Sequence, residues 1–190
     1  VRDKVILAAF GSPDPNGRQI DGIGGAVSST SKVAIISKSN VPNTEINYKF
    51  GQVSITAPVV GYKGNCGNIS AAVGPFAVDE GLISAMEPHT TVRIWQENTK
   101  KVIIAEVPVK DGKHVTEGDY SIDGVPGTGA KITLRFVDPG GAVTNKLLPT
   151  GNVKDLIETR EYGRFNVSII DAANLVVFVK ADELGLNGTE

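Results

Sequence analysis

The segment from Ile69 to Met86 constrains the fold of this chain more than any other segment. It follows an asparagine that suits the N-cap of a helix, and few polar side chains occur in it before Asp79. A helix that is apolar on nearly all sides must be enclosed by protein. Gly74 and Pro75 in its interior should bend the helix or interrupt its hydrogen bonds. We therefore predict a central, enclosed helix over about residues 69–86.

Strand patterns account for most of the remaining chain. Several stretches are rich in β-branched residues, and each is bounded by Gly, Pro, Asn or Asp. They are residues 32–37, 50–60, 91–97, 101–109, 131–138 and 166–180. A short amphipathic helix is also predicted within residues 152–163. Together these patterns predict an α+β fold, in which a curved and mostly antiparallel sheet wraps around the central helix.

The composition is that of a folded, water-soluble protein. Of the 190 residues, 41% are hydrophobic and 21% are charged, and the formal net charge is -2. This balance gives no electrostatic reason to expect a nucleic acid or an anionic membrane as a partner. The apolar runs are too short to span a bilayer. A single cysteine, Cys66, excludes an intrachain disulfide and favours a cytoplasmic location.

Cys66 stands in a stretch rich in glycine and asparagine, three residues before the predicted helix. The first backbone N–H groups of a helix lack intrahelical acceptors, so they favour an anion such as a thiolate or a substrate carboxylate. Gly64 and Gly67 would let a ligand approach the backbone closely. The residues alone leave two interpretations open, because most free cysteines are small buried core residues.

Lys32 follows a run of serine, threonine and glycine residues at the point where a predicted strand begins. A lysine in such a place is usually a solvated surface charge. If the side chain faces an enclosed pocket instead, loss of solvation favours the neutral amine, which can act as a base.

Motifs for other chemistry are weaker. The glycine run before Lys32 lacks the full spacing of a dinucleotide-binding loop, and the residues after it are β-branched rather than helical. His89 and His114 are far apart in sequence, so with one cysteine no metal-ligand spacing emerges. The chain also has no nucleophile elbow of the G-x-S-x-G kind. We therefore expect no metal and no organic cofactor.

Four long stretches resemble the PrpF family of isomerases that act on methylaconitate, methylitaconate or oxalomesaconate. They are GSPDPNGRQIDGIGGAVSSTSKVAI, GNCGNISAAVGPFAVDEGLI, VPGTGAKITLRFVDPGGAVTNKLLPTG and IIDAANLVVFVKADELGLNGTE. The matches occur in the expected order and extend over nearly the whole chain. The resemblance implies the fold of diaminopimelate epimerase, in which two similar domains each form a β-barrel around a central helix. The active site of that fold lies between the two domains.

The resemblance also implies which residues form the site. The lysine of STSK and the cysteine of NCGN, here Lys32 and Cys66, are the catalytic pair. The residues implied to hold a substrate carboxylate or to line the same cavity are Ser29, Thr30, Ser31, Asn65, Gly67, Asn68, Ser70 and Asn174. At Asn174 the chain departs from the family pattern, because Leu175 stands where relatives usually have proline.

The implied reaction moves a proton, and with it a C=C bond, along a small unsaturated di- or tricarboxylic acid. Which of Lys32 and Cys66 is the base and which is the acid stays open, and a homo-oligomer is compatible with the family. One alternative is a racemase or epimerase of the same fold, which commonly uses two facing cysteines. The other is a non-catalytic module that only binds a carboxylate.

Relative to the family, the chain is expected to be partial. Residues 1–166 are predicted to form the N-terminal barrel domain without its opening strands. Residues 167–190 are predicted to supply the first strand of a second, similar domain, whose remainder lies outside this chain.

Overall fold

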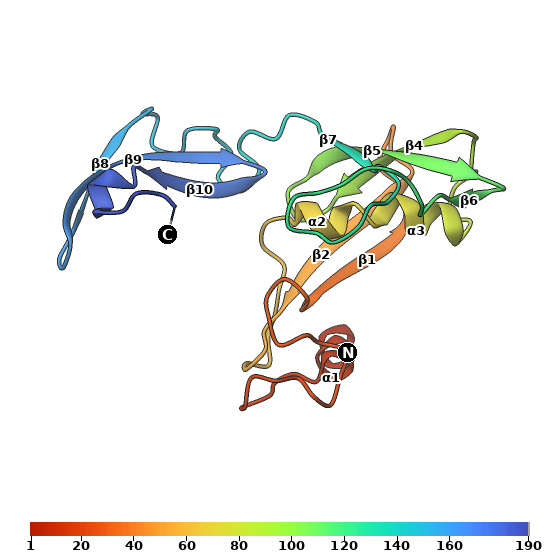
Figure 1. Ribbon diagram of the computed structural model, residues 1–190, viewed down its shortest axis with the longest axis horizontal. Coiled ribbons are helices and arrows are strands. Elements are labelled where there is room, and N and C mark those ends of the chain that lie inside the picture. Colours follow the sequence, from red (N-terminus) through yellow and green to blue (C-terminus); the bar gives the residue numbers. More distant parts are fainter. Residues whose placement is uncertain (190) are drawn as a thin grey trace. The chain divides into compact units, whose positions relative to one another are not determined.

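The computed structural model describes residues 1–189 (Figure 1). The chain forms two compact units, one from Val1 to Val137 and the other from Asp138 onward. The first unit, called unit 1, carries every predicted site residue except Asn174, which belongs to unit 2.

Unit 1 is built on a seven-stranded mixed sheet. The strand order is β1-β2-β4-β5-β6, with β3 paired to β2 and β7 paired to β5. Every pairing is antiparallel except that of β2 with β4. The strands are β1 (Lys32–Lys38), β2 (Ile46–Val53), β3 (Val60–Gly61), β4 (His89–Gln96), β5 (Lys101–Lys110), β6 (Lys113–His114) and β7 (Thr133–Phe136).

Two short helices, α2 (Gly67–Ser70) and α3 (Val73–Asp79), lie against this sheet (Figure 1). A Cβ atom at Gly74 would lie 2.8 Å from Val107 Cγ2 and 3.1 Å from Ala105 Cβ, so glycine permits the close packing of α3 on β5. The buried residues of this core are Ile46, Tyr48, Phe50, Val73, Ala77, Val78, Val92, Ile94, Ile103, Ala105, Val107 and Val109. The predicted combination of a mostly antiparallel sheet with a helix against it is therefore confirmed in unit 1.

The central helix differs from the prediction for residues 69–86 in extent and in enclosure. It begins earlier, at Gly67, and Ala71 and Ala72 separate α2 from α3. Pro75 explains the interruption, because a proline has no N–H and its ring collides with the carbonyl four residues earlier. The outer side of the helices stays open to solvent, since Ala72 and Phe76 are both exposed.

The helix ends at Asp79, well before Met86. Gly81 adopts a left-handed backbone conformation with φ of 64°, and its N–H donates to the carbonyl of Val78. The N–H of Leu82 reaches back to the carbonyl of Ala77, which completes a Schellman motif. Leu82 then packs against the core instead of continuing the helix.

An N-terminal helix, α1 (Arg2–Phe10), was not anticipated from the sequence. Leu7 and Phe10 are buried, and they pack with Val53 and Val60 in a second, smaller core cluster. A long loop, residues 11–31, then connects α1 to β1.

Unit 2 contains a three-stranded antiparallel sheet in the order β10-β9-β8. Its strands are β8 (Asp155–Thr159), β9 (Gly163–Ala172) and β10 (Asn174–Val179), and a short 3-10 helix, η1 (Asp182–Leu184), follows. The prediction of a helix within residues 152–163 is wrong. Residues 155–159 pair with β9 across a tight turn that ends at Gly163, where φ is 83°.

The structure also divides the chain at a different place from the sequence-based boundary of 166 and 167. A boundary there would cut through β9, whose residue Val167 pairs with Asp155 of β8. The stretch predicted as one strand over residues 166–180 is a hairpin of β9 and β10. Ala173, with φ of 67°, makes the turn between these two strands.

Candidate active site

Lys32 is the first residue of β1 and lies on the face of that strand that meets the helices. Side chains alternate along a strand, so Lys32, Ala34 and Ile36 share one face. Ala34 and Ile36 pack against the core cluster, and so does Cys66. Because α2 also contacts β1, Lys32 and Cys66 come from neighbouring elements on one side of the sheet.

Gln52 of β2 pairs with Lys32 and binds the same loop carbonyl. Lys32 Nζ donates to the carbonyl oxygen of Ser28. Gln52 Nε2 donates to that oxygen at 3.1 Å and to the carbonyl of Ser31 at 2.9 Å. Gln52 thus ties β2 to the end of the loop just before Lys32. Sequence reasoning missed this residue, because only the strand register places it opposite Lys32.

Gln19 holds the same loop from inside unit 1. Its side chain is buried, and Nε2 donates to Ser12 Oγ at 2.8 Å. Its Oε1 accepts from the N–H of Ala26 at 2.9 Å and from the hydroxyl of Ser31 at 2.8 Å. One glutamine therefore joins three separate positions of the loop that leads to Lys32, a role that no sequence motif indicates.

The three residues that precede Lys32 have different environments. Ser31 is fully buried, and its hydroxyl is donated to Gln19. Ser29 and Thr30 are exposed. A role in lining the substrate cavity stays a prediction for all three, but only Ser29 and Thr30 present their side chains to solvent.

Cys66 is the N-cap residue of α2, so it lies directly at the start of the helix and not three residues before it. The side chain is half-buried. Gly67 and Asn68 follow in the first turn, are exposed, and carry N–H groups for which helical geometry provides no intrahelical acceptor. Because α2 has only four residues, these N–H groups contribute more than a helix dipole to any attraction of an anion at this helix start.

Asn65 and Ser70 fix the backbone around Cys66. The Cys66 N–H donates to Asn65 Oδ1 at 2.8 Å. Ser70 is buried, and its hydroxyl lies 2.7 Å from the Cys66 carbonyl oxygen and 3.3 Å from Asn65 Oδ1. The shorter contact makes the Cys66 carbonyl the main acceptor of the Ser70 proton. The two residues implied to hold substrate thus also shape the loop that carries the cysteine.

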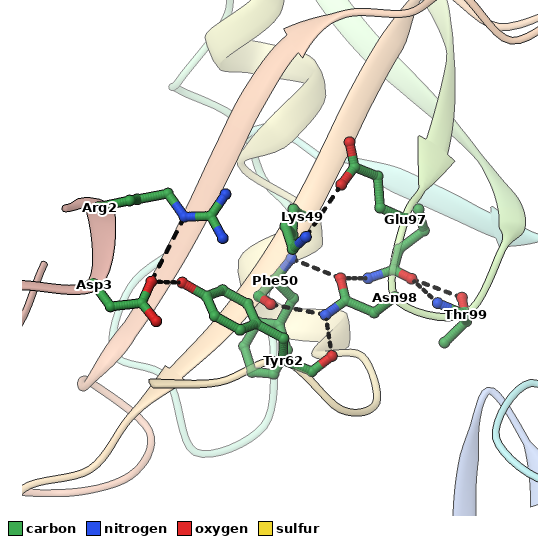
Figure 2. A network of polar contacts seen from close by, with 9 residues as sticks. Arg2, Asp3, Lys49, Phe50, Tyr62, Glu97, Asn98 and Thr99 are labelled. Carbon is green, nitrogen blue, oxygen red and sulfur yellow. Dashed lines mark hydrogen bonds and ion pairs between the residues drawn. The ribbon is translucent and has the colours of Figure 1, made fainter. Parts of the chain in front are cut away.

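Asn98 fixes the segment that precedes Cys66, and Figure 2 shows its contacts with Phe50 and Tyr62. Its Nδ2 donates to the carbonyls of Phe50 at 2.8 Å and Tyr62 at 2.6 Å, and its Oδ1 accepts from the Phe50 N–H at 2.9 Å. The Tyr62 hydroxyl donates to Asp3 of α1. Asn98 therefore links β2 to the segment that precedes Cys66, and Tyr62 links that segment to α1.

Tyr48 of β2 is fully buried in the core cluster on which Cys66 packs. The pKa of Tyr48 is raised to about 12, chiefly by burial; the Ser70 hydroxyl lowers it and the negative charge of an ionised Cys66 raises it within that value. Within residues 1–189 the Tyr48 hydroxyl meets no partner in hydrogen-bonding geometry, so the nearby Ser70 hydroxyl influences it without forming a well-aligned bond.

An apolar cavity of about 280 Å³ lies between parts of β1 and the helices, on the same face of β1 as Lys32. It is lined by Ala34, Ile36, Ile69, Ala72, Val73 and Phe76. A larger hollow of about 820 Å³ is lined by residues 8–21 and includes none of the predicted site residues. The smaller cavity therefore borders β1 and α2, two elements of the candidate site. Another hollow of about 370 Å³ lies beside the loop before Lys32, and Ser28 and Gln52 are among the residues that line it.

Asn174 is the exposed first residue of β10 in unit 2, and its part in the site stays a prediction. Among residues 1–189, no cluster of three or more His, Cys, Asp or Glu side chains could hold a metal ion. Within the same range, no helix is long and apolar enough to cross a membrane.

The whole chain, residues 1–190, matches a family model described as PrpF protein. It is 55% identical to the 3-methylitaconate isomerase of Eubacterium barkeri over 190 residues, which are 100% of this chain and 49% of that protein. It is 46% identical to the 2-methyl-aconitate isomerase of Shewanella oneidensis over 196 residues, again 100% of this chain and 49% of the relative. The chain thus spans about half the length of the curated relatives it matches.

Solved structures show the same relationship. The crystal structure of a methylitaconate-delta-isomerase, 55% identical in sequence, superposes with a TM-score of 0.78 over 100% of this chain and 48% of that one. A hydroxyproline epimerase of Agrobacterium vitis, 15% identical, superposes with a TM-score of 0.55 over 96% of this chain and 41% of that one. The second likeness concerns the fold alone. Together they confirm the predicted α+β fold class.

Proposed function

Because the chain belongs to the PrpF family, we propose that it carries the catalytic pair of a cofactor-independent isomerase. The reaction moves a proton and a C=C bond in an unsaturated di- or tricarboxylic acid, of the kind named for the methylitaconate and methylaconitate isomerases among its relatives. The main structural support is that Lys32 and Cys66 come from neighbouring elements on one side of the same sheet.

Isomerisation of such an acid needs two groups that exchange protons with carbon. One group removes a proton from a carbon next to the alkene, and the electron pair spreads through the C=C bond into the adjacent carboxylate. A second group returns a proton at the other end of the allylic system. The double bond moves, and the substrate neither gains nor loses atoms or electrons overall. Lys32 Nζ and Cys66 Sγ are the two groups that we assign to these steps.

Negative charge develops on the substrate carboxylate during the transfer, and fixed N–H donors stabilise such charge. The exposed first turn of α2, at Gly67 and Asn68, supplies donors of this kind beside Cys66. Ser29 and Thr30 are exposed just before Lys32 and are assigned to the same carboxylic acid. Asn65, Ser31 and Ser70 contribute by fixing the loops that carry the catalytic pair.

We also propose that the protein acts in the cytoplasm, which accords with its single free thiol. Its partner is the small acid itself, and a homo-oligomer is compatible with this function. A racemase of the same fold is less favoured, because this chain supplies one cysteine and such enzymes commonly use two.

Proton NMR in D₂O on the full-length protein that contains this chain tests the proposal. The protein is incubated with a panel of unsaturated di- and tricarboxylic acids and, separately, with hydroxyproline. Migration of the alkene signals in one or more acids supports the isomerase. Exchange confined to the α-proton of hydroxyproline would indicate a racemase instead, and binding of an acid without any exchange would indicate a non-catalytic module.

A further inference from the structure

The Tyr48 hydroxyl is placed in a way that folding alone does not explain. The residue is fully buried, and its hydroxyl oxygen has no hydrogen-bond partner within residues 1–189. A buried polar group without a partner lowers stability, and phenylalanine would fill nearly the same volume without that cost. Buried groups of this kind call for an explanation outside packing, such as a role in chemistry.

The neighbours of this hydroxyl are the residues that shape the cysteine loop. Cys66 packs against the buried cluster that contains Tyr48, and both Cys66 and Ser70 influence the ionisation of its hydroxyl. The Ser70 hydroxyl donates its hydrogen bond to the Cys66 carbonyl oxygen, 2.7 Å away. Burial keeps the pKa of Tyr48 at about 12, so near neutral pH the hydroxyl keeps a proton that it can donate.

We propose that Tyr48 is a positioning residue for Cys66, whose hydroxyl donates a hydrogen bond to the cysteine sulfur when the thiol is ionised. This inference rests on the proposed role of Cys66 in proton transfer. The Tyr48 ring is held by the core, whereas Cys66 is half-buried. In the proposed contact the thiol reaches the hydroxyl by rotation about its single side-chain bond. Hydrogen bonds to an ionised acceptor are markedly stronger than those to a neutral one, so the contact favours the thiolate.

The test uses the chain itself, in which one cysteine gives one alkylation signal. The rate of iodoacetamide modification is followed by intact mass across the pH range in which the thiol ionises. We expect the midpoint of this pH profile to rise by about one pH unit in Tyr48→Phe. A matched control, Tyr162→Phe, removes the hydroxyl of a tyrosine that is 73% exposed in unit 2 and should leave the midpoint unchanged.

Thermal unfolding of the same variants separates a functional hydroxyl from a structural one. Tyr48→Phe should unfold at the wild-type temperature or above it, because it removes an unpaired buried group. An unchanged alkylation midpoint, or a Tyr48→Phe chain that no longer folds, would overturn the inference. Neither readout needs a substrate, so failure here is distinguishable from failure of the isomerase proposal, which the NMR panel tests.

Discussion

The hydroxyl of Ser31 donates a hydrogen bond to Gln19 Oε1 at 2.8 Å, and both side chains are buried. This bond joins the early part of the loop after α1 to the residue immediately before Lys32. The carbonyl of Ser31 in turn accepts from the N–H of Val53 at 2.9 Å. The start of β1 is therefore held from two sides, and the position of Lys32 depends on a glutamine far from any recognisable motif.

Replacing Gln19 with methionine, which has a similar shape, should destabilise unit 1 and loosen the loop. The change leaves the Ser12 and Ser31 hydroxyls and the Ala26 N–H without their buried partner. We expect a loss of about 1–3 kcal/mol in the free energy of unfolding. Urea unfolding of the wild type and the variant measures this loss.

Arg18→Met is the matched control for this change, because the adjacent Arg18 side chain is exposed. It should leave the free energy of unfolding within about 0.5 kcal/mol of the wild type. Equal stability of the Gln19 and Arg18 variants would contradict the role given to the buried amide.

Gln52 provides a second prediction, since it pairs with Lys32 and shares the Ser28 carbonyl with it. In Gln52→Glu a carboxylate stands opposite Lys32 and favours the ammonium form over the neutral amine. If Lys32 is the base, the lower limb of the activity–pH profile of the full-length enzyme should therefore move upward by about one pH unit. Gln52→Leu removes the donor without adding charge and should lower activity with no comparable shift. The same profile in both variants would argue against Lys32 as the base.

The roles of Gln19 and Gln52 could not be predicted from the sequence, whereas the position of Lys32 could. The sequence pattern places Lys32 at the start of a strand, and the structure agrees. The same reasoning places Cys66 three residues before the helix, whereas Cys66 is the N-cap residue of α2. Strand alternation predicts which face of β1 Lys32 occupies once the strand is known. Gln19 and Gln52 depend on loop closure and on strand register, which join residues far apart in sequence and leave no local pattern.

The errors in the predicted elements have equally local causes. The apolar composition continues past Asp79 and led to a predicted helix that is too long, whereas the left-handed Gly81 ends the helix. In unit 2, residues 152–163 have an amphipathic pattern, yet pairing with β9 decides their structure. Tertiary pairing of this kind overrides weak helical propensity.

Two glycines of the central helix should respond differently to alanine. At Gly74 the new methyl group would lie 2.8 Å from Val107 Cγ2, so we expect a loss of about 1–3 kcal/mol through overpacking. At Gly67 a Cβ would meet nothing within 4 Å, and stability should be unchanged or slightly increased. The first turn of α2 is proposed to hold the substrate carboxylate. Although Gly67→Ala should leave stability unchanged, it should therefore raise KM in the full-length enzyme. Thermal unfolding and steady-state kinetics check the pair, and normal kinetics in Gly67→Ala would remove that residue from the binding site.

Asp79 at the end of α3 gives a prediction about pH. Its carboxylate accepts the backbone N–H of His114 at 3.0 Å and lies 2.6 Å from His114 Nδ1, and these bonds, the backbone one first, hold the pKa of Asp79 below 3.8. Because the folded-state pKa is depressed, the stabilising contribution is complete above about pH 4 and is lost as the pH falls through the folded value. The difference in melting temperature between wild type and Asp79→Asn should therefore shrink as the pH falls below about pH 4. A difference that persists unchanged in acid would contradict this assignment.

The most direct test of the central claim measures deuterium incorporation from D₂O into the unsaturated acid by the full-length protein and its variants. Lys32→Ala and Cys66→Ala should each slow both exchange and double-bond migration by about 100-fold or more. The double variant should be little worse than either single one, because two groups that act as a unit are not additive. Retention of wild-type exchange by either single variant would contradict the assignment of Lys32 and Cys66 as the proton-transfer pair.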